Sequence, residues 1–135
     1  MGIRLKTLGY QCWHNPGGKM EAEEEPVQTV SREVEEECGL KIPPENWTLV
    51  GETDDIFPEQ SFHTFHFVAL YQGDKQPEVK EPEKCASWQW MTFAELLDQS
   101  PEKIFLPLWN IMQDKMAWQQ VVKHNPYYKN IIIFT

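Results

Sequence analysis

The chain has 135 residues, 41% of them hydrophobic, and a formal net charge of -9 at pH 7. This length and apolar content predict one globular domain, residues 1–135, and exclude a disordered chain. The acidity argues against a long nucleic acid as a partner, because binding to the phosphate backbone normally takes a basic patch. A small nucleotide is compatible with the charge, since metal ions can neutralise its phosphates.

The cysteine usage and the hydropathy pattern indicate in which cellular compartment the protein is expected. The cysteines at positions 12, 38 and 85 form no CxxC pair, and they cannot all pair within one chain. This favours reduced thiols and a cytoplasmic protein. We expect no membrane association, because no apolar run approaches about eighteen residues and no signal peptide is recognisable.

The N-terminal part of the sequence predicts a strand and a tight turn. Residues 3–7 alternate between apolar and polar side chains, as a short strand does. The turn falls at Pro16-Gly17-Gly18, where the two glycines let the backbone approach a ligand closely.

A helix predicted between Pro26 and Gly39 carries a cluster of carboxylates. Pro suits the first turn of a helix, and Gly is typical of its C-terminal end. Glu33, Glu36 and Glu37 project together, because residues three and four apart are neighbours on a helix. Like charges this close repel, so the cluster favours a cation among them, and Mg²⁺ above all suits oxygen ligands.

The middle of the chain predicts three strands separated by loops. They are expected at residues 47–53, at residues 62–71, which have the strongest strand pattern, and toward the end of residues 81–90. Asp54 and Asp55 open a polar loop over residues 54–60. Aspartates are common in turns, although this pair could also approach a metal ion or a substrate.

The C-terminal part predicts two helices and a last strand. Thr92 and Glu95 form a capping box at the start of a short helix. Residues 106–123 carry apolar side chains at helical spacing and predict one amphipathic helix, which Asn125-Pro126 ends. The run Ile131-Ile132-Ile133-Phe134 is β-branched and typical of a strand.

A motif extends from Gly18 through Glu24 to the run Arg32-Glu33-Val34-Glu35-Glu36-Glu37-Cys38-Gly39-Leu40. This stretch, Gly18–Leu40, resembles a complete Nudix box, with each fixed position of that family pattern filled. A solvated acidic helix face would explain the charges, but it would not explain the glycines, the arginine and the spacing together.

The chain departs from the family pattern near the box. Glu23 stands where family members usually carry Gly, Thr29 where Ala is common, and Asn15 replaces a frequent Leu before the Pro-Gly-Gly turn. None of these changes removes a carboxylate. Family members also generally carry another strand, often two, before the box. We therefore expect Asn130–Phe134 to fill the slot of the missing first strand, within the chain or across a dimer.

A second segment extends the resemblance. Glu81-Pro82-Glu83-Lys84, followed after three residues by Trp88-Gln89-Trp90, is similar to the matching region of the MutT-like nucleoside triphosphate diphosphatases. In those enzymes an acidic residue before the tryptophan lies in a loop that faces the metal site. The resemblance assigns this place to Glu83, with Glu81 as the alternative, whereas a simple solvated loop would give neither residue a role.

The resemblance implies a hydrolase that splits a nucleoside diphosphate linked to another group, with Mg²⁺ or Mn²⁺ as the cofactor. The implied metal ligands are Glu33, Glu36 and Glu37, with the Gly18 carbonyl and Glu83 as further ligands. Glu24 and Arg32 would orient them, because Arg cannot bind a cation. The general base stays open among Glu36, Glu37 and Glu83.

Substrate contacts are expected from the turn, the box and a few ring side chains. The candidates are Gly17, Gly18, Lys19, Glu24, His14, Phe57 and Phe65, with Phe62, His63 and Trp88 as further candidates for binding the base. Trp90 is expected in the core. Nucleoside triphosphates are the default substrate, because residues 54–57 lack the Pro or Tyr that marks the ADP-ribose and dinucleoside polyphosphate subfamilies.

The implied fold is α/β: a Nudix fold, which is an α/β/α sandwich with a mixed, curled sheet between the box helix and the helix 106–123. Two other functions stay open. One is hydrolysis of nucleotide sugars or other nucleoside diphosphate derivatives, and the other is a nucleotide-binding module without turnover. The complete set of box carboxylates favours an enzyme, whereas the short N-terminus favours the module. The six tryptophans and an open sheet edge are compatible with a homodimer.

Overall fold

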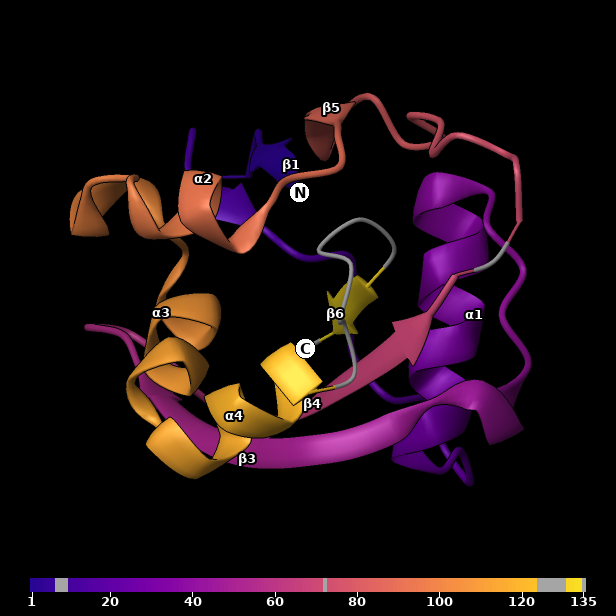
Figure 1. Ribbon diagram of the computed structural model, residues 1–135, viewed down its shortest axis with the longest axis horizontal. Helices are drawn as coiled ribbons and strands as arrows, with labels where there is room; N and C mark the ends of the chain where they lie inside the picture. Colours follow the sequence, from indigo (N-terminus) through magenta and orange to yellow (C-terminus); the bar gives the residue numbers. More distant parts are fainter. Residues whose placement is uncertain (7–9, 72, 124–130, 135) are drawn as a thin grey trace.

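The computed structural model describes residues 1–6, 10–71, 73–123 and 131–134, and its strands form two sheets (Figure 1). One sheet has the order β2-β1-β5, with β1 Gly2–Arg4, β2 Trp13–His14 and β5 Cys85–Trp88. The other has the order β3-β4-β6, with β3 Thr48–Ile56, β4 Ser61–Leu70 and β6 Ile131–Phe134. The ladders between these strands are antiparallel, and an isolated parallel bridge joins Trp13 to Ile104.

Helices lie on both sides of the β3–β4 hairpin. They are α1 Pro26–Cys38, α2 Phe93–Leu97, α3 Leu106–Gln113 and α4 Lys115–Lys123, with 3₁₀ turns η1 Pro44–Asn46 and η2 Pro101–Lys103. Successive side chains of a strand point to opposite faces. Phe67 of β4 belongs to the cluster that packs on α1, whereas Gly51 of β3, which pairs with His66, faces Ile111 of α3. The sheet therefore lies between helices, as an α/β/α sandwich requires (Figure 1).

Helix α1 forms as the sequence predicts. Pro26 occupies its first position, and Gly39 ends it in the left-handed conformation, with φ of 73°. Val30 and Val34 are buried in the cluster that contains Phe67. Burial of this valine stripe fixes the rotation of the helix and leaves the carboxylate face directed away from the cluster.

The hairpin corrects one expectation. Strand β3 continues to Ile56, so Asp54 and Asp55 lie in a strand and not in a loop or turn. Asp55 is fully buried, and its carboxylate accepts hydrogen bonds from the Thr64 hydroxyl and, at 2.9 Å, from Asn110 Nδ2. These donors replace the hydration that the carboxylate loses, which makes an acidic residue acceptable inside the strand.

The predicted helix 106–123 is interrupted, so the expectation of one continuous helix is wrong. Asp114 has ψ of 101°, an extended backbone that separates α3 from α4. Its Oδ1 accepts from the Ala117 N–H (3.0 Å) and so caps α4. A Cβ on Gly51 would stand only 2.9 Å from Ile111 Cδ1 and 3.1 Å from Ala117 Cβ, so both helices press closely on β3. The predicted end at Asn125-Pro126 lies outside the described residues.

The remaining C-terminal elements follow the prediction. Thr92 Oγ1 accepts from the Glu95 N–H (3.1 Å), and the Glu95 carboxylate accepts from the Thr92 N–H (2.9 Å), as in the expected capping box. Strand β6 pairs with Phe67–Leu70 of β4, so Ile131–Phe134 joins the sheet, while residue 130 lies outside the described residues. That β6 replaces a first strand stays a prediction. Within the described ranges, no helix is both long and apolar enough to traverse a bilayer.

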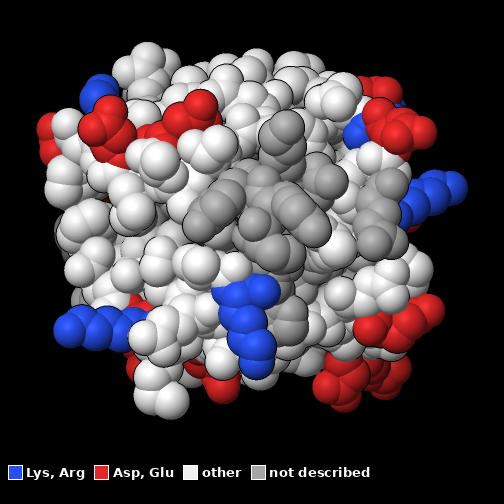
Figure 2. Space-filling model, viewed as in Figure 1, with Lys and Arg blue, Asp and Glu red and all other residues white. Residues whose placement is uncertain are grey.

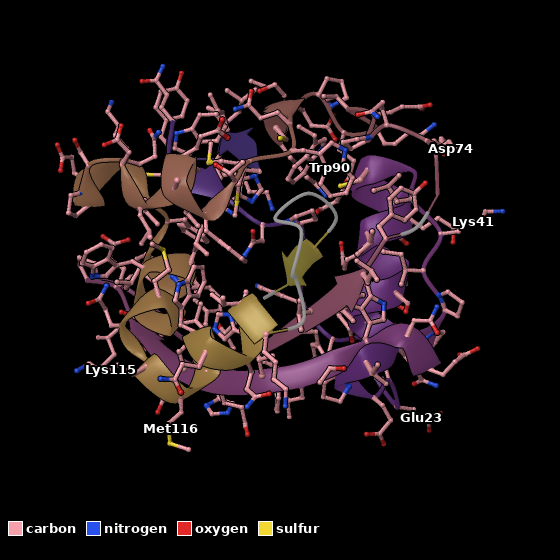
Figure 3. The ribbon with its side chains drawn as sticks, viewed as in Figure 1. Glu23, Lys41, Asp74, Trp90, Lys115 and Met116 are labelled. Carbon is pink, nitrogen blue, oxygen red and sulfur yellow. The ribbon has the colours of Figure 1, made fainter. Side chains whose placement is uncertain are left out.

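Large apolar side chains pack inward near α1, whereas on α4 at least one of them points outward. Trp90 packs against the α1 cluster as expected and stacks on Tyr71, with ring centroids 6.0 Å apart. Met116 of α4 instead projects away from the body of the protein (Figure 3). Acidic and basic side chains lie mainly toward the edges of the face shown in Figure 2.

Candidate functional site

A cavity of about 410 Å³ opens between α1, β4 and the β2-β1-β5 sheet. Its aromatic lining comes from Phe62, Phe65, Phe67, Trp88 and Phe105. Its charged lining comes from Arg4, Lys6, Lys19, Lys84, Glu37 and Glu81. The cavity therefore offers apolar faces for a ring and charges of both signs within one space.

Arg32 and Glu24 are joined by a two-point contact behind the cavity. Arg32 Nε donates to Glu24 Oε2 (2.8 Å), and Nη2 donates to Oε1 (3.0 Å). Glu24 also accepts from the Thr29 hydroxyl (2.6 Å) and the Glu21 N–H (3.0 Å). The Arg32 guanidinium is the main cause that lowers the pKa of Glu24 to about 2, and Glu24 in turn raises the pKa of Arg32. Both groups thus stay charged.

The same guanidinium reaches two further carboxylates. Arg32 Nη1 donates to Glu33 Oε1 (2.9 Å) and Glu36 Oε2 (3.1 Å), and Nη2 donates to the Lys19 carbonyl (3.1 Å). These bonds hold the acidic face of α1 against the segment that follows the Pro-Gly-Gly turn. Arg32 therefore relieves the repulsion among the glutamates and sets the direction of two of them.

Among the α1 carboxylates, Glu37 lines the cavity. Its Oε2 accepts from the Gly17 N–H (2.9 Å), which ties the turn to the helix. The pKa of Glu37 is raised to about 8, chiefly by burial and also by the negative charges of Glu33 and Glu81, against the opposing effects of the Gly17 N–H and Lys84. Burial also raises the pKa of Glu33, although Arg32 acts against it.

Gly18 is required by the position of Glu33. A Cβ built on Gly18 would stand 2.3 Å from Glu33 Oε1 and 2.4 Å from its Cδ. Any larger residue would therefore have to displace the carboxylate. The Pro16-Gly17-Gly18 turn is expected from the sequence to approach a ligand closely. In the structure its close approach is to the Glu33 side chain of α1.

The segment before β5 is attached to the C-terminal end of α1 by backbone hydrogen bonds. The Glu78 N–H donates to the Cys38 carbonyl (2.9 Å), and the Lys80 N–H donates to the Glu37 carbonyl (3.2 Å). This attachment brings Glu81, which bonds Lys84 (2.9 Å), to the cavity and near the α1 carboxylates. Glu83 is exposed and does not line the cavity, so the alternative, Glu81, is the acidic residue that the structure brings to the site.

The chain matches the family model of the NUDIX domain over residues 6–114. It belongs to the Nudix family. The solved structure of the MutT NUDIX hydrolase from Burkholderia pseudomallei is similar to it, with a TM-score of 0.58 and 25% sequence identity over 71% of this chain and 81% of that chain. The protein is a Nudix hydrolase, a pyrophosphohydrolase of nucleoside diphosphate derivatives, and it has the Nudix fold.

Nudix hydrolases generally need divalent metal cations, and the donor set on α1 fits such an ion. Glu33, Glu36 and Glu37 supply the carboxylate oxygens that hard cations prefer. A cation would also stabilise the charged forms of Glu33 and Glu37, which burial disfavours. In this structure Arg32 bonds two of the three, and among the described residues no three His, Cys, Asp or Glu side chains form a ready metal site.

The fold of this chain brings most of the predicted substrate-binding residues to the cavity. Those that line it are His14, Gly17, Gly18, Lys19, Phe62, His63, Phe65 and Trp88. Phe57 is not among the lining residues; it lies behind them, stacked on Phe105 with ring centroids 5.7 Å apart. Glu24 also lies outside the lining, in its contact with Arg32.

Sequence reasoning missed several residues of the cavity. Arg4 ends β1 and Lys6 follows the strand, so the alternation expected over residues 3–7 does not by itself place both side chains in the cavity. The Arg4 guanidinium lies 3.9 Å from the centroid of the Phe105 ring. No local sequence pattern marks Phe105 as a cavity residue. It reaches the cavity because Ile104, the residue before it, forms a parallel bridge with Trp13.

Proposed function

We propose that this Nudix hydrolase cleaves nucleoside triphosphates to a monophosphate and pyrophosphate, with Mg²⁺ as the cofactor and Mn²⁺ as a substitute. The observation that carries the proposal is the gathering of Arg4, Lys6, Lys19 and Lys84 in one cavity beside the α1 carboxylates. In a chain with a net charge of -9, such a gathering suits a strongly anionic ligand. The aromatic lining suits a base.

The residue roles follow from position. Glu33, Glu36 and Glu37, with the Gly18 carbonyl, are the groups proposed to hold the cation, and Glu81 takes the supporting place that the resemblance gave to Glu83. A cation held there would supply Lewis acidity, which would polarise a phosphoryl oxygen and lower the pKa of the attacking water. Arg32 is proposed as a positioning residue, because it contacts Glu33 and Glu36 and does not line the cavity. Glu24 is proposed to act through Arg32, which it holds at two points.

The proposed reaction is an attack of water on phosphorus. The water oxygen bonds to the phosphorus, and the bond to the leaving pyrophosphate breaks with its electron pair on the pyrophosphate oxygen. The water proton needs a general base. Glu37 is the best placed of the three candidates, because Glu36 and Glu83 are exposed and Glu37 lines the cavity. The basic side chains of Arg4, Lys6, Lys19 and Lys84 are proposed to hold the phosphates.

The test is pyrophosphate release from a panel of nucleoside triphosphates and nucleotide sugars, with Mg²⁺ and separately with Mn²⁺. Glu33→Gln and Glu37→Gln are expected to lower the rate roughly 100-fold or more. Glu35→Gln is the matched control, because Glu35 is exposed on the same helix and its partner, Lys41, is 3.8 Å away.

Other outcomes of this panel decide against the proposal. Reaction of sugar conjugates alone would make the protein a hydrolase of nucleoside diphosphate derivatives other than triphosphates. Binding without any turnover would indicate the nucleotide-binding module. The single domain over residues 1–135, the homodimer and the cytoplasmic location stay predictions, and light scattering in solution tests the dimer.

A further inference from the structure

Lys84 of the cavity wall is bonded to Glu81, the acidic residue that lies beside the α1 carboxylates. Its Nζ is 2.9 Å from Glu81 Oε2, and both side chains line the cavity together with Glu37. The Lys84 side chain is 42% exposed and the Glu81 side chain 26%, so a ligand in the cavity can reach them. An ion pair of this exposure contributes little to stability, and its partners can therefore be exchanged at low cost.

The backbone around this ion pair is held by bonds of its own. The Glu81 carbonyl accepts from the N–H groups of Lys84 (2.9 Å) and Cys85 (3.2 Å). One residue earlier, the Lys80 N–H donates to the Glu37 carbonyl (3.2 Å). Lys84 can therefore leave the Glu81 carboxylate by rotation of its flexible side chain alone, while Glu81 stays beside α1.

The charge of Lys84 acts on the same glutamates that are proposed to hold or support a cation. The pKa of Lys84 is raised, chiefly by its hydrogen bond to Glu81 and also by the negative charges of Glu37 and Glu33. The ammonium group thus stays charged among these three carboxylates. A second positive charge at the same place is repelled by it, and Glu81 Oε2 cannot serve both.

We infer that Lys84 couples the binding of the cation to the binding of the nucleotide by exchanging its partner. In the metal-free protein Lys84 neutralises Glu81 and competes with a divalent cation for this carboxylate. When Glu81 serves the cation, Lys84 is released to bind a phosphate in the same cavity. The inference rests on the proposed function, to which it adds a link between the two ligands of the site.

The first test is a calorimetric titration of the nucleotide-free protein with Mn²⁺. Lys84→Gln keeps an N–H donor for Glu81 but loses the charge, whereas Lys84→Met loses both. Both variants are expected to bind Mn²⁺ about three- to tenfold more tightly than the wild-type protein, because a competing positive charge is removed. Unchanged affinity in both variants would overturn the inference. Weaker binding by Lys84→Met alone would also overturn it, because Lys84 would then hold Glu81 in place for the cation.

The second test measures the affinity for a non-hydrolysable nucleoside triphosphate analogue, in EDTA and separately with Mg²⁺. In EDTA the Lys84 of the wild-type protein is engaged by Glu81, so Lys84→Gln should weaken binding only about twofold or less. With Mg²⁺ the same substitution should weaken binding about five- to tenfold, because coupling between two ligands is reciprocal. An equal loss in the two conditions would overturn the exchange, since Lys84 would then bind phosphate whether or not a cation is present.

Lys80→Gln is the matched control for both tests. Lys80 lies in the same segment and its Nζ is 2.8 Å from Glu78 Oε2, but it does not line the cavity. The substitution removes the same charge and is expected to leave both affinities unchanged. A gain in Mn²⁺ affinity as large as that in Lys84→Gln would overturn the inference, because the net charge of the protein would then explain it. Because the Mn²⁺ titration needs neither nucleotide nor turnover, it tests the competition by Lys84 even if triphosphate hydrolysis, and with it the proposed function, fails.

Discussion

Arg32 fixes Glu24 at both oxygens, with Nε 2.8 Å from Oε2 and Nη2 3.0 Å from Oε1. The two bonds set the plane of the guanidinium, so that Nη1 is left to contact Glu33 and Glu36. A lysine has one nitrogen and cannot form this fork. The direction of two α1 carboxylates thus depends on the planar group of Arg32 and not on its charge alone.

Arg32→Lys is therefore expected to lower kcat by about 10- to 100-fold while the protein stays folded, the usual effect of losing a group that orients metal ligands. Steady-state kinetics and thermal melting check this result. Lys41→Arg serves as a control, because Lys41 is exposed and contacts Glu35 at 3.8 Å, away from the cavity. Unchanged kinetics in Arg32→Lys would show that a positive charge at this position is sufficient to direct the α1 carboxylates.

Gly18→Ala is expected to lower activity at least tenfold with little change in stability. The new Cβ would stand 2.3 Å from Glu33 Oε1, and the flexible side chain can move aside, but it then leaves its place among the carboxylates. Pyrophosphate release and the melting temperature measure the two effects.

Gly51→Ala provides the contrasting case. There the added Cβ meets Ile111 and Ala117 in the packed core, so we expect lost stability, by about 1–3 kcal/mol, and retained activity in the folded fraction. If both glycine variants lose stability equally, the special role of Gly18 is not supported.

Glu37 predicts a pH dependence of stability in the metal-free protein. Its pKa is about 8 in the folded state, against 4.5 for the ordinary carboxyl group. Between these values the folded state holds a proton that the unfolded state has released. The contribution of Glu37 is therefore fully present below about pH 4.5 and is lost as the pH rises to 8, by at most about 5 kcal/mol.

Urea unfolding at several pH values, with EDTA present, measures this effect. Glu37→Gln cannot titrate at this position, so its stability should fall less than that of the wild-type protein between pH 5 and pH 8. Other titrating groups are common to both proteins and cancel in the difference. Parallel pH profiles would contradict the prediction.

The buried contact between Asp55 and Asn110 predicts a large effect on stability. Asp55→Ala is expected to cost about 2–4 kcal/mol of unfolding free energy, because Thr64 and Asn110 both lose their buried partner. A double-mutant cycle with Asn110→Ala should give a coupling of about 1–3 kcal/mol. Additive effects would mean that the 2.9 Å contact contributes nothing to stability.

The frame of the candidate site was predictable because its signals are local. Pro26 and Gly39 mark the ends of α1, and helical spacing puts Glu33, Glu36 and Glu37 on one helix face. Their role as metal ligands stays a prediction. What escaped prediction depends on residues far along the chain. The sequence predicts a polar loop at Asp55, because the local pattern does not show its distant partner, Asn110.

The same limit applies to the acidic segment before β5. Resemblance pointed to Glu83 first, but the backbone bonds from Glu78 and Lys80 to α1 determine which acidic residue reaches the cavity, and that residue is Glu81.

These bonds from Glu78 and Lys80 use main-chain atoms on both partners. Their geometry does not depend on which side chains residues 78 and 80 carry, apart from proline, which has no N–H to donate. The segment can therefore accumulate substitutions over evolutionary time and still hold Glu81 in register with α1. Sequence comparison of this segment alone would show divergence at positions where the spatial arrangement is retained.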